Sequence, residues 1–230
     1  MCYRVSTPKK ADLKKQLGKD ITIKDYRPHY HAAGFSHPEL PVMISSEPGA
    51  VQAVTWGFTP ENFSQDEAVK FFKSAYSLNA KAESIFTQPL YKGAAVAGKR
   101  CLIFVDGFFE WKHEQKAGKV DKVPHYIQMP NHKPFAFGGL WAERDGELTC
   151  NILTTPANEL MATIHNSKKR MPFILPEDNW ELWLDKKAEP AEVKKIIHKY
   201  PEGFLEAHEI SRKITTKGAE TDVPEIQEAI

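Results

Sequence analysis

The sequence has few cysteines and no long apolar run, and each absence excludes a class of protein. It contains only three cysteines in 230 residues. None belongs to a C-x-x-C pair, which argues against a disulfide framework and against zinc held by thiolates. No apolar run approaches the ~20 residues that span a bilayer, and no charged start precedes an apolar core of signal-peptide length. We therefore expect a cytoplasmic protein that has no membrane partner.

The sequence also lacks an excess of charge of either sign, because its formal net charge is only +1. No overall basic excess indicates nucleic acid, so any such binding must come from local patches. The stretch "HNSKKRMP" is one such patch, since Lys168, Lys169 and Arg170 follow a histidine in a turn-like segment. These three cations are candidates for holding a phosphate.

Short β-branched or aromatic runs dominate the chain, separated by Gly, Pro and Asp. The predicted strands are "LPVMIS", "AVQAVTW", "CLIFV", "GFFEWKH", "HYIQM", "PFAFGGLW", "LTCNILTT" and "MPFIL". The predicted helices are "KKADLKKQL", "SQDEAVKFFKSA", "PANELMATI", "PEDNWELWL" and "PAEVKKIIHKY". Strands outnumber helices without βαβα alternation, which predicts an α+β fold with a curved, largely antiparallel sheet. The acidic, weakly patterned residues 216–230 predict a loosely held tail.

The first residues, "MCYR", raise the question of chemistry at the N-terminus. Removal of Met1 would leave Cys2 with a free α-amine beside its thiol. Such a 1,2-aminothiol condenses with an aldehyde to form a stable thiazolidine ring. Arg4 stands two residues further on, a spacing that places a guanidinium on the same side of an extended chain.

Other polar residues stand in unexpected surroundings. Glu110 lies among aromatics in "GFFEWK", either facing solvent or partly desolvated with a raised pKa suited to proton transfer. Asn79 and Lys81 are two apart in "NAKAES", which predicts an amide beside a cation if the segment is extended. His165 ends a predicted helix, just before the basic turn.

Taken together, these segments resemble the SRAP family, whose name abbreviates SOS response-associated peptidase. The resemblance rests on "MCYR", "WGFTPE", "NAKAES", "KRCLIFVDGFFEWK", "PFAFGGLW", "ILTTPANELMATIHNSKKRMP" and "ISRK", in this order along the chain. It implies a single α+β domain over residues 2–215, with a barrel-like β core flanked by short helices. Family members act in the DNA damage response on abasic sites in single-stranded DNA, so the expected location is the bacterial cytosol and nucleoid.

The resemblance also implies roles for individual residues. Cys2 matches the residue that forms a thiazolidine DNA–protein cross-link, which shields the lesion. The positions expected to take part in catalysis with it are Asn79, Glu110 and His165. The positions expected to contact DNA are Arg4, Trp56, Lys81, Lys168, Lys169 and Arg170. No cofactor or metal is implied, and we expect a monomer.

Three departures from the family pattern stand out. Tyr3 replaces the usual glycine after the cysteine, which changes the space around the lesion. Lys81 replaces the more usual arginine, so charge is kept but bidentate phosphate geometry is lost. The stretch from His165 to Arg170 is longer than usual, so either Arg170 or a preceding lysine is the phosphate ligand.

Other functions are compatible with the same residues. An N-terminal-nucleophile hydrolase or cysteine peptidase would use Cys2, His165 and Asn79, and the same set would serve self-removal of Met1. A non-covalent single-strand or RNA-binding module would stack bases on Trp56 and Trp111 above a floor of lysines. The spacing of His29, His31 and His37 also suggests a metal site, but no acidic or cysteine partner lies close by, which favours a structural or exposed role.

Overall fold

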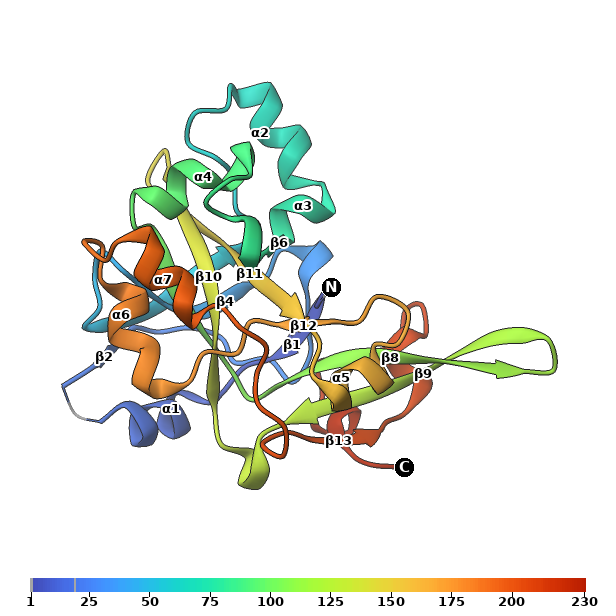
Figure 1. The fold of residues 1–230 in the computed structure, drawn as a ribbon. Helices are drawn as coiled ribbons and strands as arrows, with labels where there is room; N and C mark the ends of the chain where they lie inside the picture. Colours follow the sequence, from blue (N-terminus) through green and yellow to red (C-terminus); the bar gives the residue numbers. More distant parts are fainter. Residues whose placement is uncertain (1, 19) are drawn as a thin grey trace.

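The computed structural model describes residues 2–18 and 20–230. Five strands form a closed barrel near its centre (Figure 1), namely β4 (Glu39–Ile44), β5 (Ala50–Trp56), β7 (Arg100–Val105), β10 (Phe135–Arg144) and β11 (Glu147–Pro156). Neighbouring strands run antiparallel except for β5 and β11, whose parallel pairing closes the ring. The short strands β2 (Thr22–Ile23), β6 (Asn79–Lys81) and β12 (Arg170–Pro172) extend it.

A second, antiparallel sheet packs beside the barrel. In spatial order its strands are β13 (Glu206–Glu209), β9 (Lys119–Gln128), β8 (Gly107–Lys116), β1 (Arg4–Ser6) and β3 (Ala32–Ala33). The hairpin of β8 and β9 is paired over its whole length, and its tip projects from the body of the molecule (Figure 1). This sheet carries the N-terminal strand, so it positions Cys2.

The Asp106–Gly107 turn signal marks the corner at which the chain leaves the barrel strand β7 and enters β8 of the second sheet. A Cβ atom on Gly107 would lie 2.5 Å from the ring of Tyr126. Only glycine leaves enough room for this approach. The corner therefore fixes where β8 starts, and with it which face of the strand carries Glu110.

Seven α-helices of the described residues flank the barrel and the second sheet. They are α1 (Lys10–Leu17), α2 (Gln65–Phe72), α3 (Ala75–Leu78), α4 (Pro89–Val96), α5 (Glu159–Ile164), α6 (Trp180–Leu184) and α7 (Pro190–Ile196). Strand β7 is buried on both faces: Cys101 and Ile103 face one apolar cluster, whereas Leu102 and Phe104 face another that includes side chains of α4, α6 and α7. No helix in the described parts of the chain is long and apolar enough to cross a membrane.

The predicted α+β class with a curved, largely antiparallel and barrel-like core is confirmed. Each predicted apolar run coincides with or overlaps a strand, and each predicted helical segment contains a helix. Helix α4 was not predicted, because Gly93 in its middle weakens the helical pattern. Proline at the first helical position costs nothing, since its missing N–H has no partner in a helix.

Residues 216–230 differ from the loosely held tail expected from their composition. Ile226 is buried in a small cluster with Phe109 and Ile214. Gln227 donates a hydrogen bond from Nε2 to the carbonyl oxygen of Tyr30 at 2.8 Å. One buried isoleucine and a few directed hydrogen bonds hold the segment, and neither leaves a periodic pattern in the sequence.

Candidate functional site

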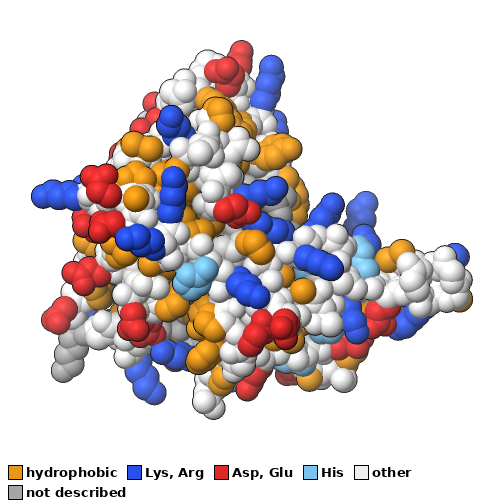
Figure 2. Space-filling view, in the orientation of Figure 1, with side chains coloured by type: hydrophobic (Ala, Val, Ile, Leu, Met, Phe, Trp, Pro, Cys, Tyr) orange, Lys and Arg blue, Asp and Glu red, His pale blue; other side chains and the backbone are white. Residues whose placement is uncertain are grey.

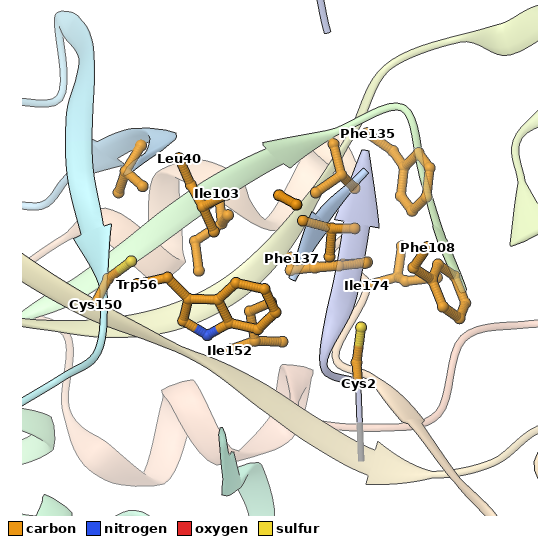
Figure 3. Close-up of a cluster of buried hydrophobic side chains, with 14 of the residues drawn as sticks. Cys2, Leu40, Trp56, Ile103, Phe108, Phe135, Phe137, Cys150, Ile152 and Ile174 are labelled. Atoms are coloured by element: carbon orange, nitrogen blue, oxygen red, sulfur yellow. The ribbon is translucent and has the colours of Figure 1, made fainter. Parts of the chain in front are cut away.

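Cys2 lies two residues before the start of β1, at the edge of the apolar cluster between the two sheets (Figure 3). Its exposed fraction is 0%. Asn79, the first residue of β6, donates a hydrogen bond from Nδ2 to the carbonyl oxygen of Cys2 at 2.8 Å. The side-chain amide of the "NAKAES" motif thus holds the main chain of the "MCYR" motif. The Oδ1 atom of Asn79 is buried and has no hydrogen-bond partner.

Glu110 faces the same cluster because of strand alternation in β8. Its neighbours Phe109 and Trp111 point to the opposite face, where they join the cluster of Ile214 and Ile226. Glu110 is 5% exposed, and burial raises its pKa to about 8. Its Oε1 atom is buried without a hydrogen-bond partner. Of the two sequence-based alternatives, the structure supports the desolvated acid.

His165 directly follows α5 and is 6% exposed. Its Nδ1 lies 2.8 Å from the carbonyl oxygen of Arg170, which can only accept, so Nδ1 carries the proton and Nε2 is the basic nitrogen. The same Nδ1 is 3.7 Å from Oε1 of Glu110. Burial lowers the pKa of His165 to about 4. Near neutral pH the pair therefore combines a mostly protonated carboxyl with an uncharged imidazole.

The thiol of Cys2 is held in its protonated form. Burial raises its pKa well above the ordinary value, and the nearby charge of Glu110 raises it further. The Sγ atom donates weakly to the carbonyl oxygen of Arg4 at 3.6 Å. A thiolate nucleophile needs a lowered pKa, so this environment does not suit a cysteine peptidase. It suits a sulfur that reacts after another group has made the first bond.

Four of the five expected DNA-contacting cations fall into two groups. Lys81, Lys168 and Lys169 are exposed. Arg170 is not open to a ligand in the same way, because its guanidinium forms a two-point ion pair with Glu83, with Nη2 at 3.0 Å from Oε2. Lys and Arg side chains are interspersed with acidic ones on the face in Figure 2, so the local arrangement matters more than net charge.

Trp56 requires a correction. It was expected near the DNA, but its exposed fraction is 0%. Its indole Nε1 donates to the carbonyl oxygen of Leu78 at 2.9 Å, and Figure 3 shows the ring inside the apolar cluster. It cannot stack on a base without leaving the core. Its role is to pack beneath α3 and the strand that carries Asn79.

Aromatic rings do occur near Cys2, and two of them, Phe35 and Tyr76, are exposed rings that sequence reasoning missed. The ring of Tyr3 packs on that of Phe35, with centroids 5.1 Å apart, and Phe35 is 60% exposed. Tyr76 in α3 is 64% exposed. The signal for Tyr3 was its position in "MCYR", but nothing in the sequence linked residues 3 and 35. Glu83, the partner of Arg170, was also missed, although it stands in "NAKAES".

The three histidines considered as metal ligands have other partners. His29 lies 2.9 Å from Asp222, His31 lies 2.9 Å from Arg4, and His37 stacks on Phe72. Across residues 2–18 and 20–230 there is no group of three or more His, Cys, Asp or Glu side chains that could hold a metal ion. The removal of Met1 concerns a residue outside those that the structure describes.

The chain is similar to known proteins in sequence and in fold. A family model described as SOS response associated peptidase (SRAP) matches residues 1–217. "Abasic site processing protein YoqW" of Bacillus subtilis is 31% identical over 198 residues, which is 84% of this chain and 83% of that protein. "Abasic site processing protein HMCES" of Gallus gallus is 28% identical over 236 residues, covering 87% of this chain and 66% of that protein.

A crystal structure of a Bacteroides thetaiotaomicron protein superposes over the whole of both chains with a TM-score of 0.86 and 27% identity. A Bordetella bronchiseptica protein gives a TM-score of 0.75 at 20% identity, over 91% of this chain and 100% of that one, which shows the fold alone. With the family model spanning nearly the whole chain, the protein belongs to the SRAP family.

Proposed function

We propose that this chain processes abasic sites in DNA by forming a covalent thiazolidine with the lesion in single-stranded DNA through Cys2, once Met1 has been removed. The observation that carries the proposal is the setting of Cys2, whose carbonyl is held by Asn79 and whose protonated thiol is buried beside Glu110. The names of the relatives YoqW and HMCES support the choice of lesion.

The chemistry follows from the states of these groups. An abasic deoxyribose in its ring-opened form carries an aldehyde, and an α-amine of pKa ~7.7–8 is partly neutral near pH 7 and attacks it. Water leaves the resulting carbinolamine to give an iminium ion. The thiol then adds to the iminium carbon and releases its proton, which closes the ring. The net reaction joins aldehyde and aminothiol with loss of one water.

Glu110 and His165 have protonation states that suit opposite transfers. Glu110, with a pKa raised to about 8, donates a proton to the departing oxygen when the sugar ring opens and when water leaves. The imidazole of His165 is uncharged and carries its proton on Nδ1. Its Nε2 accepts the proton released from the sugar hydroxyl or the thiol. Asn79 orients the Cys2 main chain so that its amine and thiol reach the same carbon.

The strand is held by charge and by stacking. Arg4, Lys81, Lys168 and Lys169 contact phosphates, while the ring pair of Tyr3 and Phe35 supports a base beside the lesion. An abasic nucleotide in a single strand has no base to unstack, so placing it in the site costs little. One copy of the chain carries every group named, and it acts as a monomer.

The direct test is intact-mass analysis after incubation with an abasic single-stranded oligonucleotide. The expected product has the combined mass of the protein that begins at Cys2 and the oligonucleotide, less one water. A matched oligonucleotide with an intact base is the control. Absence of the product from a protein confirmed to begin at Cys2 would overturn the proposal. Turnover of an unrelated peptide would instead favour the peptidase.

A further inference from the structure

The Arg4 side chain is held by contacts from three separate parts of the chain. Its Nη1 lies 2.9 Å from Nε2 of His31 and 3.3 Å from the carbonyl oxygen of Ile214. Its guanidinium carbon sits 5.3 Å from the ring centroid of Trp111. A cation over an aromatic face with two directed hydrogen bonds has little freedom to change its orientation.

The hydrogen bonds of Arg4 determine the state of His31. A guanidinium has only donors, so Nε2 of His31 must accept. Its Nδ1 therefore carries the proton and donates to Oγ1 of Thr221 at 2.8 Å. His31 is 7% exposed and is neutral in this arrangement. Oγ1 of Thr221 thus accepts from the tautomer of His31 that Arg4 requires and holds the orientation of the ring.

Asp222 fixes the backbone that carries His31. Its Oδ1 accepts from the backbone N–H groups of Tyr30 at 2.7 Å and of His31 at 3.1 Å. Its Oδ2 lies 2.9 Å from Nδ1 of His29. Ile226, 1% exposed, anchors the segment that follows. The carboxylate of Asp222 therefore holds three successive residues, 29–31, which precede β3 and face Arg4.

We propose that Thr221 and Asp222 position Arg4 for a DNA phosphate by way of His31. Both N–H groups of Nη1 are used inside the protein. In the part of the chain that the structure describes, this leaves Nε and Nη2, the side of the guanidinium that binds two oxygens of one phosphate in parallel. Preorganisation in this way lowers the entropy lost when the strand binds.

This inference rests on the proposed function in one respect, namely that Arg4 contacts the strand. The two positioning residues come after residue 217, where the match to the family model ends. They belong to the segment whose composition suggested a loose tail. Residues 216–230 instead contribute to DNA binding indirectly, because Thr221 and Asp222 position Arg4 through His31.

Substitution of Asp222 separates a charge effect from a positioning effect, because the two predict opposite changes in DNA affinity. Asp222→Ala and Asp222→Asn both remove a negative charge, so electrostatics alone predicts tighter DNA binding for both. Asn keeps an Oδ1 acceptor for the N–H groups of Tyr30 and His31, whereas Ala does not. We therefore expect Asp222→Ala to weaken binding while Asp222→Asn does not. Thr221→Val, which is nearly isosteric, should weaken binding in the same direction.

The measurement is the Kd for an intact single-stranded oligonucleotide at several salt concentrations, with thermal melting to confirm folding. Asp222→Ala should lower the salt slope by about 0.7, the share of one phosphate contact on a single strand. In an Arg4→Ala background, Thr221→Val should change neither Kd nor slope, and Asp222→Ala should bind no more weakly than Asp222→Asn, because only the shared charge effect remains. A purely structural role would weaken binding in both backgrounds.

Two results would overturn the inference. One is Asp222→Ala binding as tightly as Asp222→Asn in the presence of Arg4. The other is an Arg4→Ala variant whose Kd equals that of the unmodified protein. Neither involves the cross-link, because the oligonucleotide has no abasic site. Failure of the covalent reaction is seen separately, as the missing adduct in the mass spectrum.

Discussion

Asn79 donates its side-chain N–H to the carbonyl oxygen of Cys2, joining the second residue of the chain to strand β6. This bond fixes the main chain beside the groups that we propose to react. Asn79→Leu keeps much of the volume but leaves a buried carbonyl unpaired and its position free. We expect the cross-linking rate at saturating DNA to fall about 10²-fold, with little change in Kd.

The comparison of single-turnover rate with Kd separates this role from a general loss of structure. Asn79→Asp is the matched variant, because a carboxylate facing a carbonyl oxygen repels it. It should react more slowly than Asn79→Leu at high pH. If DNA affinity and single-turnover rate fall by the same factor in both variants, the positioning role is contradicted.

The two halves of Cys2 should have separable roles. Cys2→Ser keeps the amine once Met1 is removed, so an imine that borohydride traps should still form. The adduct that survives without reductant should be lost, because the hydroxyl does not replace the sulfur. A Met1-retaining form should give no adduct that survives without reductant, since its Cys2 nitrogen is a planar amide and cannot form the thiazolidine. Stable cross-linking by that form would show that the thiazolidine mechanism is wrong.

The rate of cross-linking should have a bell-shaped dependence on pH. The amine must be neutral, which gives a rising limb through ~7.7–8. Glu110 must be protonated, which gives a falling limb above its pKa of about 8. Glu110→Gln should slow the reaction about 10²- to 10⁴-fold and remove the falling limb. A falling limb that persists in Glu110→Gln would assign it to another group.

Glu110 should also make stability depend on pH. The pKa of Glu110 is 4.5 in a model peptide and about 8 in the fold, so between these values the folded state binds more protons than the unfolded state. The free energy of unfolding should therefore fall as pH rises from about 4.5 to about 8. Denaturation of the native protein and Glu110→Gln across this range isolates the effect. Parallel curves would mean that Glu110 is ionised in the fold.

Exposed lysines should contribute more to the salt dependence of DNA binding than the paired arginine does. Replacing both Lys168 and Lys169 by Ala should lower the salt slope by up to about 1.4, at ~0.7 for each phosphate contact. Arg170→Ala should change it less, because Glu83 already neutralises the guanidinium. Glu83→Gln is the control, and it should steepen the slope by freeing Arg170. An unchanged slope in the double lysine variant would leave these residues as solvated surface.

The sequence predicted the strands well because each contains enough apolar residues to show its burial. The runs around Ile103 and Phe137 are examples, since both faces of these strands are covered. Sequence motifs also indicated the four groups of the candidate site. Their desolvation was not predictable, because the burial of Glu110 and His165 depends on residues far away in the chain.

The errors have a common physical origin. Trp56 lies in a motif expected near DNA, but an apolar ring is equally suited to a core, and only the packing distinguishes the two. The partners of Arg4 were missed because Thr221 and His31 are 190 residues apart. A hydrogen bond over such a separation leaves no trace in local composition. The same holds for the ion pair of Glu83 with Arg170.

The candidate site draws its residues from almost the full length of the chain, and this has a consequence for the order of synthesis. Cys2 is synthesised before Asn79, Glu110 and His165, and Asp222 follows all four. At ~5–20 residues per second, several seconds separate the synthesis of Cys2 from that of His165. During that interval Cys2 has neither Glu110 nor His165 beside it in a folded site. The complete site therefore assembles only after translation has passed its most distant members, so it forms by long-range docking and not by local folding.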